Sequence, residues 1–182
     1  MAPSEEARLI AVTGRKQHGK STIADYLFQR GFQVCAFADP IKHMLRESLG
    51  LSLDQTDGHL KEVIDPRYGV TPRHLMQTLG TEWGRKHVRD DLWVRLLIAR
   101  ARALHNAGYD VVVADVRFPN EAAALRAAGF SIWRVVRPGL PAAPDAHESE
   151  AHFDAIEADH VLINDKSLDE LLAAVRTLMK ES

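Results

Sequence analysis

The sequence has few features of a membrane or secreted protein. Cys35 is its one cysteine, so an internal disulfide is excluded, which suits a reducing compartment. No apolar run approaches the roughly 18 residues needed to span a membrane. Residues 1–14 also lack the basic flank and long apolar stretch of a signal peptide. We therefore expect a cytoplasmic protein with no membrane partner.

The sequence also lacks an excess of charge of either sign. The 23 Lys and Arg residues nearly balance the 25 Asp and Glu residues, so the chain lacks the positive field that attracts nucleic acid. Its content of 46% hydrophobic and 26% charged residues is that of an ordinary globular protein. The 182 residues suffice for one domain and leave little room for a second core. We expect a single domain that binds a small anionic molecule.

Strand-like runs alternate with helix-like segments along the chain. Five apolar runs have the character of buried strands, at residues 8–12, 32–37, 109–115, 131–136 and 160–164. Helical periodicity is found at residues 21–30, 40–49, 71–80, 92–108, 119–129, 147–156 and after Ser167, which forms a capping box with Glu170. Residues 53–70 are expected to form a loop with short helical pieces. The alternation predicts a doubly wound α/β fold with a mainly parallel, five-stranded sheet.

The clearest motif lies between the first strand and the first helix. Gly14 and Gly19 are five residues apart, and Lys20 and Ser21 follow, which is the phosphate-loop pattern. In this position backbone N–H groups and the helix dipole point toward an anion. Lys20 is expected to contact the β- and γ-phosphates of a nucleoside triphosphate, and the Ser21 hydroxyl to coordinate Mg²⁺. The motif predicts a P-loop phosphotransferase.

A carboxylate and several cations are predicted at the same edge of the sheet. Asp115 ends a buried strand, where an aspartate commonly supports the Mg²⁺ shell, although it could instead cap a helix or form a salt bridge. The cations lie in the loop or near strand ends and are Lys16, Lys42, Arg117, Arg134 and Arg137. Each alone has the character of a solvated surface charge. Because ligands bind at the carboxyl ends of strands in such sheets, we expect these cations to converge on the transferred phosphoryl group.

Further segments resemble the phage-type deoxynucleoside monophosphate kinases. They are FADPIKHML, TPRHLMQTLGTEWGR, DLWV, DVRFPNEAAALRAAG, HESE and NDKSLDEL, in the family's order, and the resemblance runs from Arg8 to nearly the end. It implies an adenylate-kinase-like P-loop fold that transfers the γ-phosphate of ATP to a deoxynucleoside monophosphate. It further implies a mainly helical acceptor-binding region at residues 40–107 and a lid-like segment at about 138–157. The host cytoplasm would be the location, and a homodimer would be consistent with the family.

The resemblance implies roles for individual residues. The ATP phosphates would be held by residues 14–22, including Thr22, and Lys16 would face both phosphate groups. The acceptor's monophosphate would be bound by Lys42, Arg73 and Arg117, and its sugar and base would be bordered by Gln77, Gly80, Thr81, Trp93 and Glu121. Arg134 and Arg137 would lie at a lid edge, and Asn164 to Lys166 would flank the donor adenine. His147 and Glu150 would lie near the active site.

Other interpretations of these residues stay open. Trp93 could be a core aromatic, Gln77 an exposed helical residue and Glu121 a residue that favours a helix N-terminus. Gly80 and Thr81 could end one helix and cap the next. The HESEAH segment does not match the zinc-protease motif, because His147 and His152 are five residues apart rather than four.

The family pattern is not matched throughout. The T-even phage members have an aspartate where this chain has Ser21, and residues 51–70 show little resemblance, so the base preference is not predicted. Two other functions are open. One is a kinase of the dephospho-coenzyme A kinase type, which shares the P-loop architecture. The other is a nucleotide-binding partner protein without catalysis, although Lys20 and the acceptor cations that such a protein could lose are present.

Overall fold

The computed structural model describes residues 7–140 and 155–181, which form two compact units. The sheet unit contains the described residues up to Ala36 and from Ile98 onward, and the helical unit is Phe37–Leu97. Within the described ranges, no helix combines the length and the apolar character that crossing a membrane requires. The predicted single kinase domain, with an acceptor region at 40–107 and a lid near 138–157, stays a prediction.

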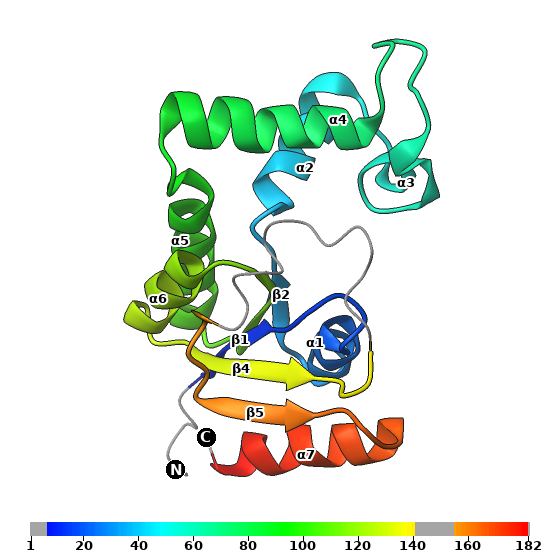
Figure 1. Cartoon of the computed structure of the whole chain (residues 1–182). Helices are drawn as coiled ribbons and strands as arrows, with labels where there is room; N and C mark the ends of the chain where they lie inside the picture. Colours follow the sequence, from blue (N-terminus) through cyan, green and yellow to red (C-terminus); the bar gives the residue numbers. More distant parts are fainter. Residues whose placement is uncertain (1–6, 141–154, 182) are drawn as a thin grey trace. The chain divides into compact units, whose positions relative to one another are not determined.

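The sheet unit is built on a five-stranded parallel sheet (Figure 1). Its strands are β1 (Leu9–Thr13), β2 (Gln33–Cys35), β3 (Val111–Val116), β4 (Ser131–Val136) and β5 (His160–Ile163). Their order across the sheet is β2-β3-β1-β4-β5, and all neighbouring pairs are parallel. This confirms the predicted doubly wound α/β fold, because parallel neighbours require crossover connections.

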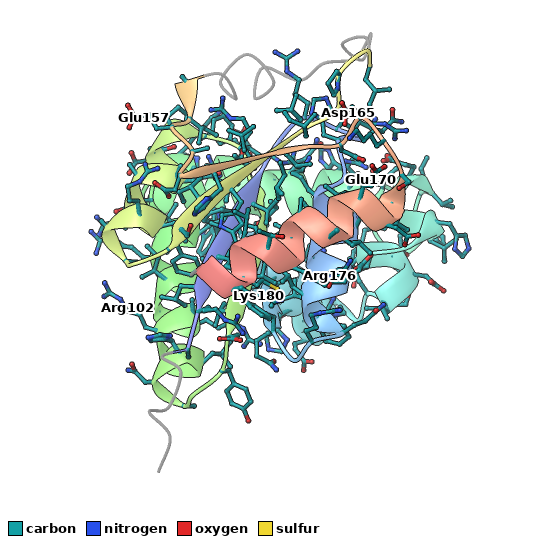
Figure 2. All side chains as sticks on the ribbon, turned by 90° about the horizontal axis from the view of Figure 1, so that it is seen from below. Arg102, Glu157, Asp165, Glu170, Arg176 and Lys180 are labelled. Carbon is teal, nitrogen blue, oxygen red and sulfur yellow. The ribbon has the colours of Figure 1, made fainter. Side chains whose placement is uncertain are left out.

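Alternate side chains of the strands face opposite sides of the sheet. On one side Val12, Val112 and Trp133 are buried in a cluster with residues of α1 (Lys20–Phe28) and α7 (Leu168–Glu181). Figure 2 shows α7 running across this side, with Glu170 toward one end and Lys180 toward the other. Of the intervening strand residues, Ala11, Val113 and Ile132 are also buried, and α6 (Pro119–Ala127) contacts β4. Helices therefore cover both sides, as a parallel sheet requires.

The helix ends follow the capping chemistry that the sequence predicts. The Ser167 hydroxyl accepts a hydrogen bond from the Glu170 backbone N–H at 3.3 Å, and the Glu170 carboxylate accepts one from the Ser167 N–H at 3.2 Å. This reciprocal pair starts α7. At the start of α4 (Pro72–Gln77), the Thr71 hydroxyl caps the helix by accepting from the His74 N–H at 3.1 Å. Both predicted helix starts are confirmed.

The helical unit packs short helices around a small core. It contains α2 (Asp39–Leu49), α3 (Leu53–Thr56), the 3₁₀ helix η1 (His59–Glu62), α4, and the first half of α5 (Leu92–Asn106). The buried residues of its core are Ile41, Leu45, Leu51 and Trp93. The short helical pieces that were predicted for residues 53–70 correspond to α3 and η1.

The helix that begins at Pro72 does not end at Gly80. It continues as the π-helix η2 (Thr78–Val88). A Cβ at Gly80 would lie 2.9 Å from Ile41 Cδ1, and one at Gly84 would lie 2.4 Å from the Trp93 ring. The Trp93 indole N–H also donates to the Gly80 carbonyl oxygen at 2.7 Å. The two glycines therefore allow Ile41 and the Trp93 indole to pack closely against the helix.

Candidate active site

The phosphate loop joins the end of β1 to the first turn of α1. Gly14 has a φ of 149°, and a Cβ there would lie 2.4 Å from the Val135 carbonyl oxygen. Gly19, directly before α1, has a φ of 115°, and its Cβ would lie 2.9 Å from Asn164 Nδ2. Both positions combine a backbone conformation that L-residues avoid with close packing. Glycine is therefore needed at both ends of the loop.

Two side chains hold the loop to the neighbouring strands. His18 is buried, with 9% of its surface exposed, and its Nδ1 lies 3.3 Å from both the Val135 carbonyl oxygen and the Arg137 backbone nitrogen. The Asn164 side-chain amide donates to the His18 carbonyl oxygen at 2.9 Å. Sequence reasoning did not single out His18 and placed Asn164 beside the donor adenine. The sole sequence signal for His18 is its position inside the motif.

The residues that follow the loop glycine lie on α1. The Lys20 ammonium donates to the Arg15 carbonyl oxygen at 2.8 Å, so this side chain folds back over the loop. Ser21 is exposed and Thr22 is half-buried, both in the first turn of α1. Lys16 lies in the loop and is exposed. The loop thus presents backbone N–H groups, two hydroxyls and two ammonium groups.

Further predicted residues lie at the carboxyl edge of the same sheet. The Thr13 hydroxyl donates to the Val116 carbonyl oxygen at 3.1 Å, which joins the ends of β1 and β3 next to Asp115. Arg134 pairs with Thr13 in the strand register. Because the strands are parallel, their ends share this edge with the loop. The predicted residues of the sheet unit at this edge are Lys16, Lys20, Asp115, Arg117, Arg134, Arg137, Asn164 and Lys166.

Two of the edge arginines differ in their surroundings. Arg117 is exposed directly after β3, whereas Arg134 is half-buried within β4. The Arg134 Nε is buried and has no hydrogen-bond acceptor among the described residues. Lys166 is exposed and forms an ion pair with Glu170 at 3.6 Å.

Glu121 supports the turn that begins with Arg117. It is 2% exposed, and its Oε2 accepts hydrogen bonds from the backbone N–H groups of Arg117 at 2.9 Å and Phe118 at 3.2 Å. These bonds satisfy donors at the start of α6. Glu121 therefore caps α6 by hydrogen bonds, and its place in the first turn of α6 agrees with the alternative interpretation that it favours a helix N-terminus. Through its bond to the Arg117 N–H, it fixes the backbone from which the Arg117 side chain extends.

In the helical unit, cations from three helices gather around two carboxylates. Lys42 and Arg46 of α2 form ion pairs with Asp57, the latter at 3.2 Å, and Arg73 of α4 forms an ion pair with Glu62. Lys61 of η1 is close enough that the charges of Lys42 and Arg73 affect its pKa. We call Lys42, Arg46, Lys61 and Arg73 the cationic cluster.

The ionisation of Asp57 reflects this charge. Partial burial raises the pKa of Asp57, but the hydrogen bonds from Lys42 and Thr56 and the charge of Lys42 outweigh it and hold the pKa below its ordinary value. Asp57 therefore stays ionised near neutral pH. Sequence reasoning predicted Lys42 and Arg73 and missed Arg46 and Lys61, whose place in the cluster depends on how α2, η1 and α4 pack.

The predicted base-contacting residues of the helical unit separate into exposed and buried groups. Gln77 and Thr81 are exposed, whereas Gly80 and Trp93 are buried. Trp93, 2% exposed, belongs to the core, which agrees with the alternative interpretation. Trp83 is 43% exposed, and its ring centroid lies 6.3 Å from that of Trp93. Trp83 is therefore the exposed tryptophan of this unit.

Two predicted residues, His147 and Glu150, lie outside the described residues. Within the described part of the chain, no group of three or more His, Cys, Asp or Glu residues is arranged to hold a metal ion.

The sequence is similar to those of several viral kinases. A family model described as deoxynucleotide monophosphate kinase matches residues 52–175. A putative deoxynucleotide monophosphate kinase of Acanthamoeba polyphaga mimivirus is 35% identical over 186 residues, which cover 92% of this chain and 93% of the relative. The deoxynucleotide monophosphate kinase of Enterobacteria phage T4 is 37% identical over 109 residues, which cover 59% of this chain and 45% of the phage protein.

Solved structures of other kinases share the fold. A sugar kinase from Janibacter sp. has a TM-score of 0.55 and 15% identity, and the match covers 96% of this chain and 95% of that chain. The Mycobacterium tuberculosis APS kinase in complex with AMPPNP and APS has a TM-score of 0.51 and 19% identity, with 96% and 99% covered. At these identities the likeness shows the fold alone.

Proposed function

The chain belongs to the deoxynucleotide monophosphate kinase family, and we propose that it transfers the γ-phosphate of ATP to a deoxynucleoside monophosphate. The products are the deoxynucleoside diphosphate and ADP. The observation that supports this most directly is the phosphate loop, in which packing requires glycine at positions 14 and 19. Such a loop implies ATP use, and the family supplies the acceptor.

The donor phosphates are proposed to bind the loop at residues 14–22. Its backbone N–H groups and the positive end of the α1 dipole favour an anion. Lys20, which donates to the Arg15 carbonyl oxygen at 2.8 Å, would exchange this acceptor for oxygens of the β- and γ-phosphates. Lys16 would contact the donor and acceptor phosphates. Asn164 and Lys166, which follow β5 at the same edge of the sheet, would border the donor nucleotide.

Mg²⁺ fits the oxygen groups at this edge. Ser21 offers an exposed hydroxyl in the first turn of α1, and Asp115 offers a carboxylate near the end of β3. Mg²⁺ prefers such oxygen ligands and commonly uses one or two protein groups together with phosphates and water. Ser21 and Asp115 would therefore hold it, and when bound it neutralises charge on the donor phosphates.

The acceptor monophosphate is proposed to bind Lys42 and Arg73 of the helical unit. An oxygen of the acceptor phosphate attacks the γ-phosphorus, and the bond from that phosphorus to the β–γ bridging oxygen breaks. Because the attacking oxygen is already anionic, no general base is required. Arg117, Arg134 and Arg137 would stabilise the charge of the transferring group. The acceptor's sugar and base are proposed to lie near Gln77 and Thr81.

A substrate screen tests this proposal. Purified protein is incubated with ATP, Mg²⁺ and each of the four deoxynucleoside monophosphates or dephospho-coenzyme A, and ADP formation is followed. We expect turnover with at least one deoxynucleotide and none with the coenzyme precursor. Turnover of dephospho-coenzyme A alone would overturn the proposal. The homodimer, the cytoplasmic location and the choice of base stay predictions.

A further inference from the structure

One cation of the helical unit has no carboxylate of its own. Lys61 is half-buried in η1. Its ammonium forms neither an ion pair nor a hydrogen bond with any residue that the structure describes. The other three members of the cationic cluster, in contrast, are paired with Asp57 or Glu62.

The surroundings of Lys61 disfavour its charge. Partial burial lowers its pKa, and repulsion by Lys42 and Arg73 lowers it further, while the attraction of Asp57 and Glu62 does not compensate. Burying a cation among like charges reduces stability unless an anion balances it. A lysine selected only for stability would not be expected at this position.

The two nearby carboxylates are already bonded to other groups. Asp57 pairs with Lys42 and Arg46, and its Oδ2 also accepts from the Thr56 hydroxyl at 2.8 Å. Glu62 pairs with Arg73. Four cations and two carboxylates leave a net charge of +2. A phosphate monoester carries about −1.5 to −2 at neutral pH, so its charge matches this surplus.

The backbone fixes Lys61 next to its neighbours. A Cβ at Gly58, between α3 and η1, would lie 2.7 Å from Asp54 Oδ1 and 2.8 Å from Asp54 Cα, so glycine permits a close turn there. After this turn η1 contacts both α3 and α4. Lys61 therefore lies on an element that packs beside α3, which Asp57 follows, and beside α4, which carries Arg73. In Figure 1 these helices belong to the cyan and green part of the chain.

We propose that Lys61 is a further phosphate-binding residue, which together with Lys42 and Arg73 binds the monophosphate of the acceptor. This inference rests on the proposed function, because that reaction supplies a phosphate monoester as the acceptor. Lys61 then has its counter-anion only when the acceptor is bound.

Steady-state kinetics of Lys61 variants test the proposal. Lys61→Ala should raise the KM for the deoxynucleoside monophosphate by about 10- to 100-fold, because a charge-assisted contact to phosphate is lost. The KM for ATP should stay within about twofold. Lys61→Arg, which keeps the cation, should recover most of the affinity. Lys86→Ala is the matched control, since Lys86 is an exposed lysine of the same unit that pairs with Glu82 at 2.8 Å.

Thermal unfolding separates a binding role from a structural one. Because Lys61 is held among like charges, the Tm of Lys61→Ala should equal or exceed that of the wild type. An unchanged KM for the acceptor in Lys61→Ala would overturn the proposal. A lower Tm together with equal rises in both KM values would overturn it as well, because the residue would then be structural.

A phosphate titration keeps this test independent of the reaction. Inorganic phosphate is titrated by calorimetry into wild type and Lys61→Ala, each saturated with AMPPNP to occupy the phosphate loop. The wild type should bind phosphate at least about tenfold more tightly than Lys61→Ala. If the wild type turned over no deoxynucleotide, the proposed function would fail, and equal phosphate affinities would separately overturn the role of Lys61.

Discussion

The phosphate loop and the cationic cluster are built for anions in different ways. The loop relies on backbone N–H groups, on two required glycines, and on the hydrogen bonds that His18 accepts from the Arg137 N–H and from the Asn164 amide. The cluster relies on side-chain charges that Asp57 and Glu62 partly neutralise. Changes in the loop should therefore disturb geometry and cause large losses. Changes in the cluster should cause graded losses that depend on charge.

The largest effect is expected from removal of the loop lysine. Lys20→Ala eliminates the cation that faces the donor phosphates, and we expect kcat to fall about 10²- to 10³-fold. The variant should keep the wild-type Tm within a few degrees. The measurement is ADP formation under saturating substrates, and a kcat within tenfold of the wild type would contradict the role of Lys20.

A smaller effect is expected from a methyl group at the start of the loop. Gly14→Ala places a Cβ 2.4 Å from the Val135 carbonyl oxygen at a φ of 149°. We expect a loss of roughly 1–3 kcal/mol in unfolding free energy and a higher KM for ATP. The acceptor KM should change little.

Gly31→Ala is the control for that variant. Gly31 also has a positive φ of 92°, but a Cβ there meets no described atom within 4 Å. It should lose stability from backbone strain alone and keep the wild-type KM for ATP. Equal effects of the two substitutions on the ATP KM would show that close packing of the loop is unimportant.

A moderate effect is expected from loss of the Asn164 support. Asn164→Ala removes the 2.9 Å hydrogen bond to the His18 carbonyl oxygen. We expect the KM for ATP to rise about 3- to 10-fold, as one net hydrogen bond predicts. The ratio of ATP to GTP turnover should not change if Asn164 supports the loop. A changed ratio would instead assign Asn164 to the donor base.

The smallest effect concerns the acid stability of the cluster. The pKa of Asp57 is lowered because bonds from Lys42 and Thr56 outweigh the effect of burial. Its contribution to stability is present above the ordinary pKa and is lost as the pH falls through the folded value. Between about pH 5 and pH 3, the wild-type Tm should fall more than that of Asp57→Asn. The corresponding difference in the free energy of unfolding should be at most about 1 kcal/mol, since Asp57 is partly exposed. If the Tm of the wild type and that of Asp57→Asn fell equally with pH, Asp57 would not contribute to the acid sensitivity of the cluster.

The same contrast explains what the sequence could predict. The loop has a fixed local spacing, and the neighbouring strands β1, β3 and β4 are short, mainly apolar runs, so Gly14, Gly19 and the sheet could be predicted directly. Ser167 and Glu170 likewise specify the start of α7 through a local pattern. These features depend on residues close together in the chain.

Features that depend on tertiary packing were not predictable. Gly80 has the appearance of a helix end, yet packing of Ile41 and Trp93 against Gly80 and Gly84 accompanies a π-helix. The surroundings of Arg46 and Lys61 arise only when α2, η1 and α4 pack together. Whether Trp93 is buried could not be decided from the sequence, because an aromatic residue in an amphipathic helix can face either the core or the solvent.

The most direct test of the proposed reaction is a ³¹P NMR time course with ATP, Mg²⁺ and one deoxynucleoside monophosphate at a time. For at least one acceptor, the wild type should form deoxynucleoside diphosphate and ADP in equal amounts, with no release of inorganic phosphate. ADP formation at the same rate without acceptor, accompanied by inorganic phosphate, would show an ATPase and contradict the assignment.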